Sequence, residues 1–120
     1  MKTRESAENY LETIYILSQG SDQVHSIDIV HELDYSKPSV SVAMKNLREN
    51  GYIEIDDDGH ITLTSNGLKI ATSMYERHTV MSDWLVSLGV DRKTADNDAC
   101  KMEHSMSEKS FSAIKNHIEK

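Results

Sequence analysis

Three side chains that commonly bind metal ions lie within five consecutive residues near the end of the chain. Cys100, Glu103 and His104 stand at positions i, i+3 and i+4, and residues at these offsets project from one face of a helix. A thiol, a carboxylate and an imidazole on one helical turn are typical of half a transition-metal site. An ordinary helix surface explains the same triplet equally well, because such spacings are not rare.

Two other predicted helices carry further candidate ligands. Asn9 and Glu12 lie at i and i+3 on the first helix, beside the Leu11 and Ile14 core positions, and His78 lies on a long helix in the middle of the chain. Each has an ordinary structural interpretation when it is taken alone. A lone buried histidine is more often a hydrogen-bonded core residue than a ligand, and a surface glutamate is normally just solvated.

The charge of the chain limits how it can meet nucleic acid. A net charge of −7 argues against binding through the whole surface, so any contact with DNA must be local. Residues 35–48 contain Lys37, Lys45 and Arg48 and no acid, which makes them the one basic strip in the first half. A dimer would present this strip twice.

Length and composition set the remaining bounds. A chain of 120 residues holds one modest core, or a small domain with a helical extension that needs a partner. No apolar run approaches the roughly 18 residues of a membrane span, and no secretory signal opens the chain, so we expect a cytoplasmic protein. The single cysteine excludes an internal disulfide and leaves Cys100 as a core residue, a free thiol or a ligand.

The first half of the chain predicts a winged helix-turn-helix. Apolar spacing predicts helices over residues 6–18 and 27–33, with Ser26 as the N-cap of the second. Ser36 caps a third helix that ends before Gly51. The predicted inward residues of the second and third helices are Ile27, Val30, Leu33, Val40, Met44 and Leu47. Strands at 52–55 and 60–63 flank the turn at Asp57-Asp58-Gly59 and form the wing.

The second half predicts only helices, over about 65–88, 92–102 and 108–118. The stripe expected on the long helix consists of Leu68, Ala71, Met74, Tyr75, His78, Met81 and Leu85. These apolar stripes have few partners within so short a chain, so they favour a homodimer. The predicted fold is therefore mainly α, with a winged helix-turn-helix domain at 1–64 (wing about 52–63) and a helical metal-binding and dimerisation domain at 65–120.

Five collinear stretches resemble the diphtheria toxin repressor and manganese transport regulator family of metal-dependent repressors. They are residues 8–15, 36–41, 63–67, 77–78 and 98–107, which together span nearly the whole chain. The resemblance implies a homodimer that binds a double-stranded DNA operator when it holds a divalent metal. It is to the short form, without the carboxy-terminal SH3-like domain of longer members.

The resemblance also implies the residues of both sites. The metal ligands would be Asn9, Glu12, His78, Cys100, Glu103 and His104, with Asn9 where relatives have an acid or a methionine. The DNA-reading residues would be Ser36, Lys37, Pro38, Ser39 and Ser41, with Lys45 near phosphate, and the capping pattern agrees with this helix. The wing departs from the pattern, because Asp56, Asp57 and Asp58 stand where many wings carry cations.

The donor types bear on the metal. A thiolate, imidazole and carboxylate set suits Fe(II), Co(II), Ni(II) and Zn(II) better than Mn(II), which prefers oxygen. Cys100 resembles the iron-responsive branch of the family and Glu12 the manganese branch. We expect Fe(II), with Mn(II) next, and binding of Zn(II), Co(II) or Ni(II) in vitro.

Two other classes of function stay open at this stage. A metal-independent winged-helix regulator would keep its DNA binding in excess chelator. An enzyme with Cys100 as nucleophile and His78 or His104 as base is disfavoured, because nothing in the sequence resembles an oxyanion hole or a glycine-rich substrate loop.

Overall fold

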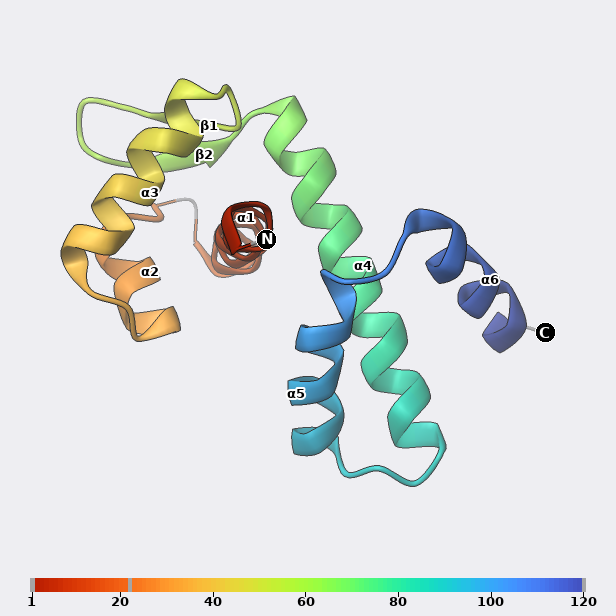
Figure 1. The fold of residues 1–120 in the computed structure, drawn as a ribbon. Helices are drawn as coiled ribbons and strands as arrows, with labels where there is room; N and C mark the ends of the chain where they lie inside the picture. Colours follow the sequence, from red (N-terminus) through yellow and green to blue (C-terminus); the bar gives the residue numbers. More distant parts are fainter. Residues whose placement is uncertain (1, 22, 120) are drawn as a thin grey trace. The chain divides into compact units, whose positions relative to one another are not determined.

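The structure, a computed structural model, describes residues 2–21 and 23–119. Within these residues six helices and a two-stranded sheet follow one another along the chain (Figure 1). They are α1 (Lys2–Gly20), α2 (Ser26–Leu33), α3 (Lys37–Glu49), β1 (Ile53–Ile55), β2 (Ile61–Leu63), α4 (Ser65–Ser87), α5 (Arg92–Glu103) and α6 (Glu108–Glu119). The predicted mainly helical fold is confirmed.

The chain forms two compact units, one up to Thr72 and one from Ser73 onward. The division falls inside α4, because this helix contributes its first two turns to one core and its remaining turns to another. The domain boundary expected between residues 64 and 65 stays a prediction. None of the helices in the described residues combines the length and apolar character that crossing a membrane requires.

The first unit is built around a helix-turn-helix. Helices α2 and α3 contact each other, and α1 contacts both of them as well as β2. The apolar side chains buried together in this unit are Tyr10, Leu11, Ile14, Ile29, Val40, Met44, Leu47, Ile53, Ile61 and Ala71. Every element of the unit therefore contributes to one core, and these contacts hold α3 in place on the surface of the unit.

The ends of α3 follow from local chemistry. The Ser36 hydroxyl accepts from the Ser39 backbone N–H at 3.2 Å, and the proline in the first turn removes an N–H that would have had no partner. Gly51, just past the helix, has φ of +81°, a conformation that glycine adopts without steric cost. The predicted N-cap and stop are both confirmed.

Two predictions for α2 are wrong. The N-cap is His25 and not Ser26: its backbone N–H donates to Asp28 Oδ2 at 2.9 Å. The core residue is Ile29, which is fully buried, whereas Ile27 is 39% exposed. In an eight-residue helix the periodicity allows two neighbouring faces, and the packing against α1 and α3 selects between them.

The wing is a short antiparallel hairpin in which Ile53 pairs with Leu63 and Ile55 with Ile61. Its inner face buries Ile53 and Ile61 in the core of the first unit. Asp56 closes the turn, because its Oδ1 accepts from the backbone N–H groups of Asp58 and His60 at 2.9 Å each. The predicted wing is confirmed, with each strand reduced to three residues.

The start of α4 packs very closely against the residue that precedes the wing. Thr64 caps the helix, accepting from the Gly67 N–H at 3.2 Å and donating to the Gly51 carbonyl at 2.7 Å. An added Cβ at Gly67 would lie 2.0 Å from the Tyr52 carbonyl oxygen. Only glycine fits at this position without moving the backbone.

The second unit has its own smaller core. Met81 of α4, Ala99 of α5 and Phe111 of α6 are buried together. The connections carry the expected caps: Gly89 has φ of +104°, and the Asp91 carboxylate accepts from the Thr94 N–H at 3.0 Å. The three predicted helices of the second half are therefore confirmed.

The predicted apolar stripe of α4 is only partly correct. Leu68 and Tyr75 are 44% and 42% exposed. Ala71, Met74 and Met81 of the predicted stripe are buried, and Arg77 and Ser82, which were not predicted, are buried as well. The prediction assumed that one face of the helix packs against a single core, whereas α4 contributes to two. Its buried face also includes polar side chains, which form hydrogen bonds with α5.

We predict that Gly67→Ala destabilises the protein by at least about 1–3 kcal/mol, the usual cost of forcing a group into a filled site. Gly20→Ala is the matched control, because nothing lies within 4 Å of a Cβ at that position. Urea unfolding of both variants measures the difference. Equal stability of the two variants would contradict the close approach to Tyr52.

Candidate metal centre

The six predicted ligands divide between the two units. Asn9 and Glu12 lie one turn apart on α1 of the first unit. The backbone carbonyl of Asn9 accepts from the Thr13 hydroxyl at 2.9 Å. His78, Cys100, Glu103 and His104 all belong to the second unit, where α4 and α5 carry the first three and His104 follows α5 directly.

Glu103 and His78 form the central contact of the second unit. His78 Nδ1 donates to Glu103 Oε1 at 2.9 Å, and Glu103 is fully buried. This hydrogen bond to a carboxylate raises the pKa of His78 above its ordinary value of 6.5, outweighing the opposing effect of partial burial. The bond orients the ring and uses Nδ1, so Nε2 is the ring nitrogen that this bond does not occupy.

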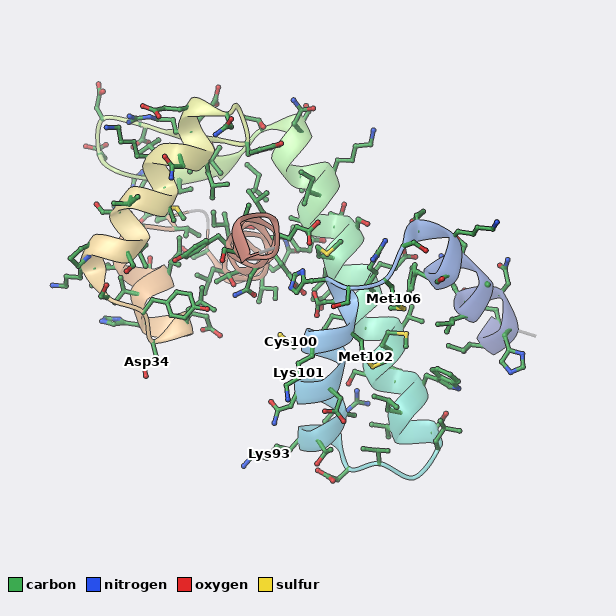
Figure 2. The ribbon with its side chains drawn as sticks, in the orientation of Figure 1. Asp34, Lys93, Cys100, Lys101, Met102 and Met106 are labelled. Carbon is green, nitrogen blue, oxygen red and sulfur yellow. The ribbon has the colours of Figure 1, made fainter. Side chains whose placement is uncertain are left out.

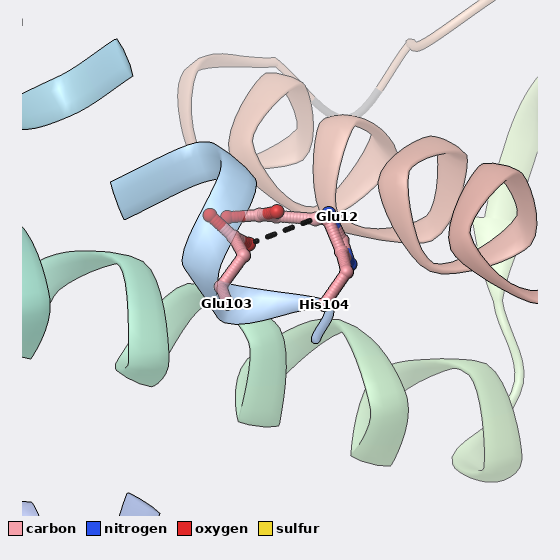
Figure 3. Close-up of side chains that lie close together, drawn as sticks. All are labelled: Glu12, Glu103 and His104. Carbon is pink, nitrogen blue, oxygen red and sulfur yellow. Dashed lines mark ion pairs between the residues drawn. The ribbon is translucent and has the colours of Figure 1, made fainter. Parts of the chain in front are cut away.

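His104 lies just past α5 as its C-cap, with φ of −87° and ψ of −12°. Its Nε2 is 3.8 Å from Glu103 Oε2 (Figure 3). Because these angles remain close to helical values, His104 continues the direction of the helix although α5 ends at Glu103. The structure thus brings His78, Glu103 and His104 together around one carboxylate.

Cys100 differs from these three in its exposure. The residue is exposed, whereas Ala99 and Glu103 on α5 are buried. Its side chain leaves α5 on the opposite side from that of Met102 (Figure 2). A thiol ligand must be accessible and deprotonated, and this placement provides access; the role of Cys100 as a ligand stays a prediction.

Arg77 holds the end of α5 in place. Although it is only 7% exposed, its guanidinium donates to the carbonyl oxygens of Glu103 at 3.0 Å and Met106 at 2.6 Å and stacks over the Phe111 ring. These bonds position the backbone that carries Glu103 and His104. This role was not predicted, although Arg77 directly precedes the candidate ligand His78 in the sequence.

Asp96 is the second residue that the sequence analysis missed. Its Oδ1 lies 3.8 Å from His78 Nε2 and accepts from the buried Ser82 hydroxyl. Arg92 donates to Ser82 Oγ and to Asp83 Oδ1, each at 2.9 Å. Asp96 precedes Cys100 by four residues, so the same helical spacing that selected the triplet would have included it.

The residues of the second unit fit a divalent cation. Glu103 Oε2 is buried and has no hydrogen-bond partner among the described residues. A buried carboxylate oxygen without a hydrogen bond is costly, and buried charges are normally paired or bound to a metal. His78 lies at Oε1 of this carboxylate and His104 at Oε2, and one carboxylate with two imidazoles is a donor set that suits a transition metal.

A second group with ligand chemistry lies at the wing, where single atoms of Asp56, Asp58 and His60 come within 4.8 Å of one another. The turn accounts for this arrangement, because Asp56 Oδ1 binds two backbone N–H groups and Oδ2 lies 3.2 Å from His60 Nδ1. The hydrogen bond from the His60 backbone is the main reason that the pKa of Asp56 falls below its ordinary value.

The predicted DNA-reading residues all lie on the outside of the first unit. At the start of α3 and along its outer face, all six are exposed: Ser36, Lys37, Pro38, Ser39, Ser41 and Lys45. The core residues of the same helix, Val40, Met44 and Leu47, face inward. The outer face of α3 is therefore free of core contacts.

Comparison with known proteins assigns a family to both units. Residues 2–61 match the family model described as the N-terminal DNA binding domain of iron dependent repressors. Residues 64–120 match the model for the metal binding and dimerisation domain of the same repressors. The two matches follow each other along the chain in the order of the two units.

Individual relatives agree with this assignment. The chain is 31% identical over 118 residues to an HTH-type transcriptional regulator of Methanocaldococcus jannaschii, covering 97% of this chain and 94% of the relative. It is 33% identical over 112 residues to the transcriptional regulator MntR of Escherichia coli, covering 93% of this chain and 72% of MntR.

A solved manganese-dependent transcriptional repressor in complex with manganese shares the fold, with a TM-score of 0.86 and 25% identity. The match covers 94% of this chain and 52% of the repressor, so this chain spans about half the length of that protein. A winged helix followed by a helical unit with a carboxylate and imidazole cluster defines the class of metal-dependent, DNA-binding transcriptional repressors. The chain belongs to the iron-dependent repressor family.

We predict that, in metal-free protein, the His78 imidazole titrates above 6.5, because its protonated form gains the hydrogen bond to Glu103. The stability gained from this bond is complete below pH 6.5 and is lost as the pH rises through the raised pKa. Glu103→Gln should return the pKa of His78 toward its ordinary value, as followed by NMR. Glu119→Gln removes the same charge from an exposed position and should leave the titration unchanged.

Proposed function

We propose that this chain represses transcription when a divalent metal ion, Fe(II) in preference to Mn(II), activates its binding to a DNA operator. The observation that carries the proposal is the buried carboxylate of Glu103, which has an imidazole near each oxygen and whose Oε2 has no hydrogen-bond partner among the described residues. If no cation bound there, this buried oxygen would have no hydrogen bond and no paired charge, which is energetically costly.

The proposed ligands are the six residues Asn9, Glu12, His78, Cys100, Glu103 and His104. His78, Glu103 and His104 are already close together within the second unit. Cys100 would add a thiolate, which favours Fe(II) over Mn(II) because manganese prefers oxygen donors. Zn(II), Co(II) and Ni(II) should also bind in vitro, since the same donors suit them.

The ligands come from both units, and this division supports a mechanism of activation. Asn9 and Glu12 belong to the helix that packs against α2 and α3, whereas the remaining four lie on α4, on α5 or directly after it. Glu12 from the first unit and His78, Glu103 and His104 from the second would hold the ion, which would supply the positive charge that offsets their carboxylates. Ligands drawn from both units would lower the ordering cost of operator binding.

DNA recognition is proposed to use α3 of each subunit in a homodimer, with Ser36, Lys37, Pro38, Ser39, Ser41 and Lys45 facing the major groove. Residues 1–64 form the DNA-binding domain and residues 65–120 the metal-binding and dimerisation domain. Apolar side chains exposed on or beside α4, among them Tyr75 and Leu88, support a partner surface in the second domain. The protein would act on DNA in the cytoplasm, without enzymatic activity.

We expect that Glu103→Gln and His104→Ala each abolish metal-stimulated operator binding while the protein remains a folded dimer. Both changes remove a ligand without adding volume. The measurement is an anaerobic DNA-binding titration with chelator, then with Fe(II), Mn(II) or Zn(II). Circular dichroism and gel filtration confirm the fold and the dimer.

The matched control is Glu119→Gln, an exposed glutamate of α6, which should retain the full metal response. An unchanged metal dependence in Glu103→Gln would overturn the proposed centre. DNA binding by the unaltered protein in excess chelator would instead identify a metal-independent regulator.

The role of Cys100 has a separate test. Because the chain has a single cysteine, a maleimide reagent reports on this thiol alone. We expect Fe(II) or Mn(II) to slow the labelling of folded protein strongly, because a ligated thiolate is withheld from the reagent. Equal labelling with and without metal would remove Cys100 from the ligand set, and Glu119→Gln protein should behave like the unaltered protein.

A further inference from the structure

One apolar side chain on the outer face of α3 has no role in the core. Val42 is 60% exposed, whereas the other large apolar residues of the helix, Val40, Met44 and Leu47, are no more than 5% exposed. An exposed valine gains nothing from burial and is a weaker helix former than most residues. Val42 is not among the residues of the core of the first unit or those packed against it.

The surroundings of Val42 are specific. Pro38 precedes it by four residues and Ser39 by three, so the three share one face of the helix, and Lys45 follows three residues later. Pro38, Ser39 and Lys45 are all exposed, and so is Asn46, four residues after Val42. Val42 and Pro38 thus form a small apolar spot beside a hydroxyl, an amide and a cation.

The serine hydroxyls beside this spot are partly committed to the fold. Ser36 Oγ donates to Ser39 Oγ at 2.8 Å and accepts from the Ser39 backbone N–H at 3.2 Å. The single hydroxyl proton of Ser36 is therefore used within the cap and is not available to a base edge. Ser36 therefore offers a base edge no hydroxyl donor, which leaves base recognition to the other exposed side chains of α3.

Charge favours a nucleic acid over a protein as the occupant of this face. Residues 35–48 carry Lys37, Lys45 and Arg48 and no acidic residue, within a chain whose net charge is −7. A local cationic surface on an acidic body suits phosphate. In the major groove the apolar group on a base edge is the C5-methyl of thymine.

We propose that Val42, beside Pro38, contacts the C5-methyl group of a thymine and sets a preference for thymine at one position of each half-site. The inference rests on the proposed function, in which α3 enters the major groove. Val42 has one strongly preferred rotamer in a helix, so its two methyl groups form a rigid surface and little side-chain entropy is lost on binding.

The test uses uracil, which differs from thymine only by the missing methyl group. An operator is first selected from a random double-stranded library with the Mn(II)-loaded dimer, and each thymine is then replaced singly by uracil. We expect one position in each half-site where uracil weakens binding about fourfold, the effect of roughly one buried methyl group. Val42→Ala should abolish that difference between thymine and uracil.

Ile16→Ala is the matched control, because Ile16 is another exposed apolar residue, 44% exposed on α1, and it should keep the full uracil effect. An uracil effect that persists in Val42→Ala, or a selected operator that tolerates uracil at every position, overturns the inference. Lys45→Ala tests separately whether α3 is the helix that binds DNA. If this change leaves DNA affinity intact as well, α3 is not the reading helix and that part of the proposed function fails.

Discussion

The buried carboxylate of Glu103 is the constraint around which the second unit is organised. A buried carboxylate costs several kcal/mol unless it is paired and hydrogen-bonded. One of its oxygens accepts from His78, and Arg77 binds the Glu103 backbone carbonyl. The Arg77 guanidinium therefore fixes the backbone of Glu103. The second carboxylate oxygen, Oε2, lies on the side of His104. The proposed cation would supply the partner that Oε2 lacks among the described residues.

The first unit separates its structural face from its functional face. All the core residues of α3 point toward α1, α2 and the wing, while the exposed positions carry cations, hydroxyls, one valine, Asn46 and, in the last turn, Glu49. Because the whole chain is acidic, this cationic strip is the local feature that suits phosphate, and the acids of the wing turn serve the turn itself through Asp56. The two units can thus serve different ligands without competing for the same residues.

The parts of the fold that were predictable from sequence were those that local hydrogen bonds determine. The caps by Ser36, Asp91 and Ser107 are formed between residues three apart, so they do not depend on distant contacts. One cap was predicted wrongly, at α2, where His25 and not Ser26 is the N-cap, and the other errors arose where packing chose between alternatives. Ile29 replaced Ile27 in the core, and α4 turned out to serve two cores.

By itself, the sequence determined the order of helices, the wing, the family resemblance and the spacing of the Cys100, Glu103 and His104 triplet, because each depends on residues near one another in the chain. Only the tertiary structure decided that Glu103 is fully buried and hydrogen-bonded to His78, and that Cys100 is exposed. It also decided that Arg77 binds the Glu103 carbonyl and that Asp96 lies beside His78. Helical spacing defines which residues share a face. The packing of α5 on α4 and α6 decides which residues of that face are buried away from water. A carboxylate oxygen without a hydrogen bond favours binding a metal ion only where it is buried.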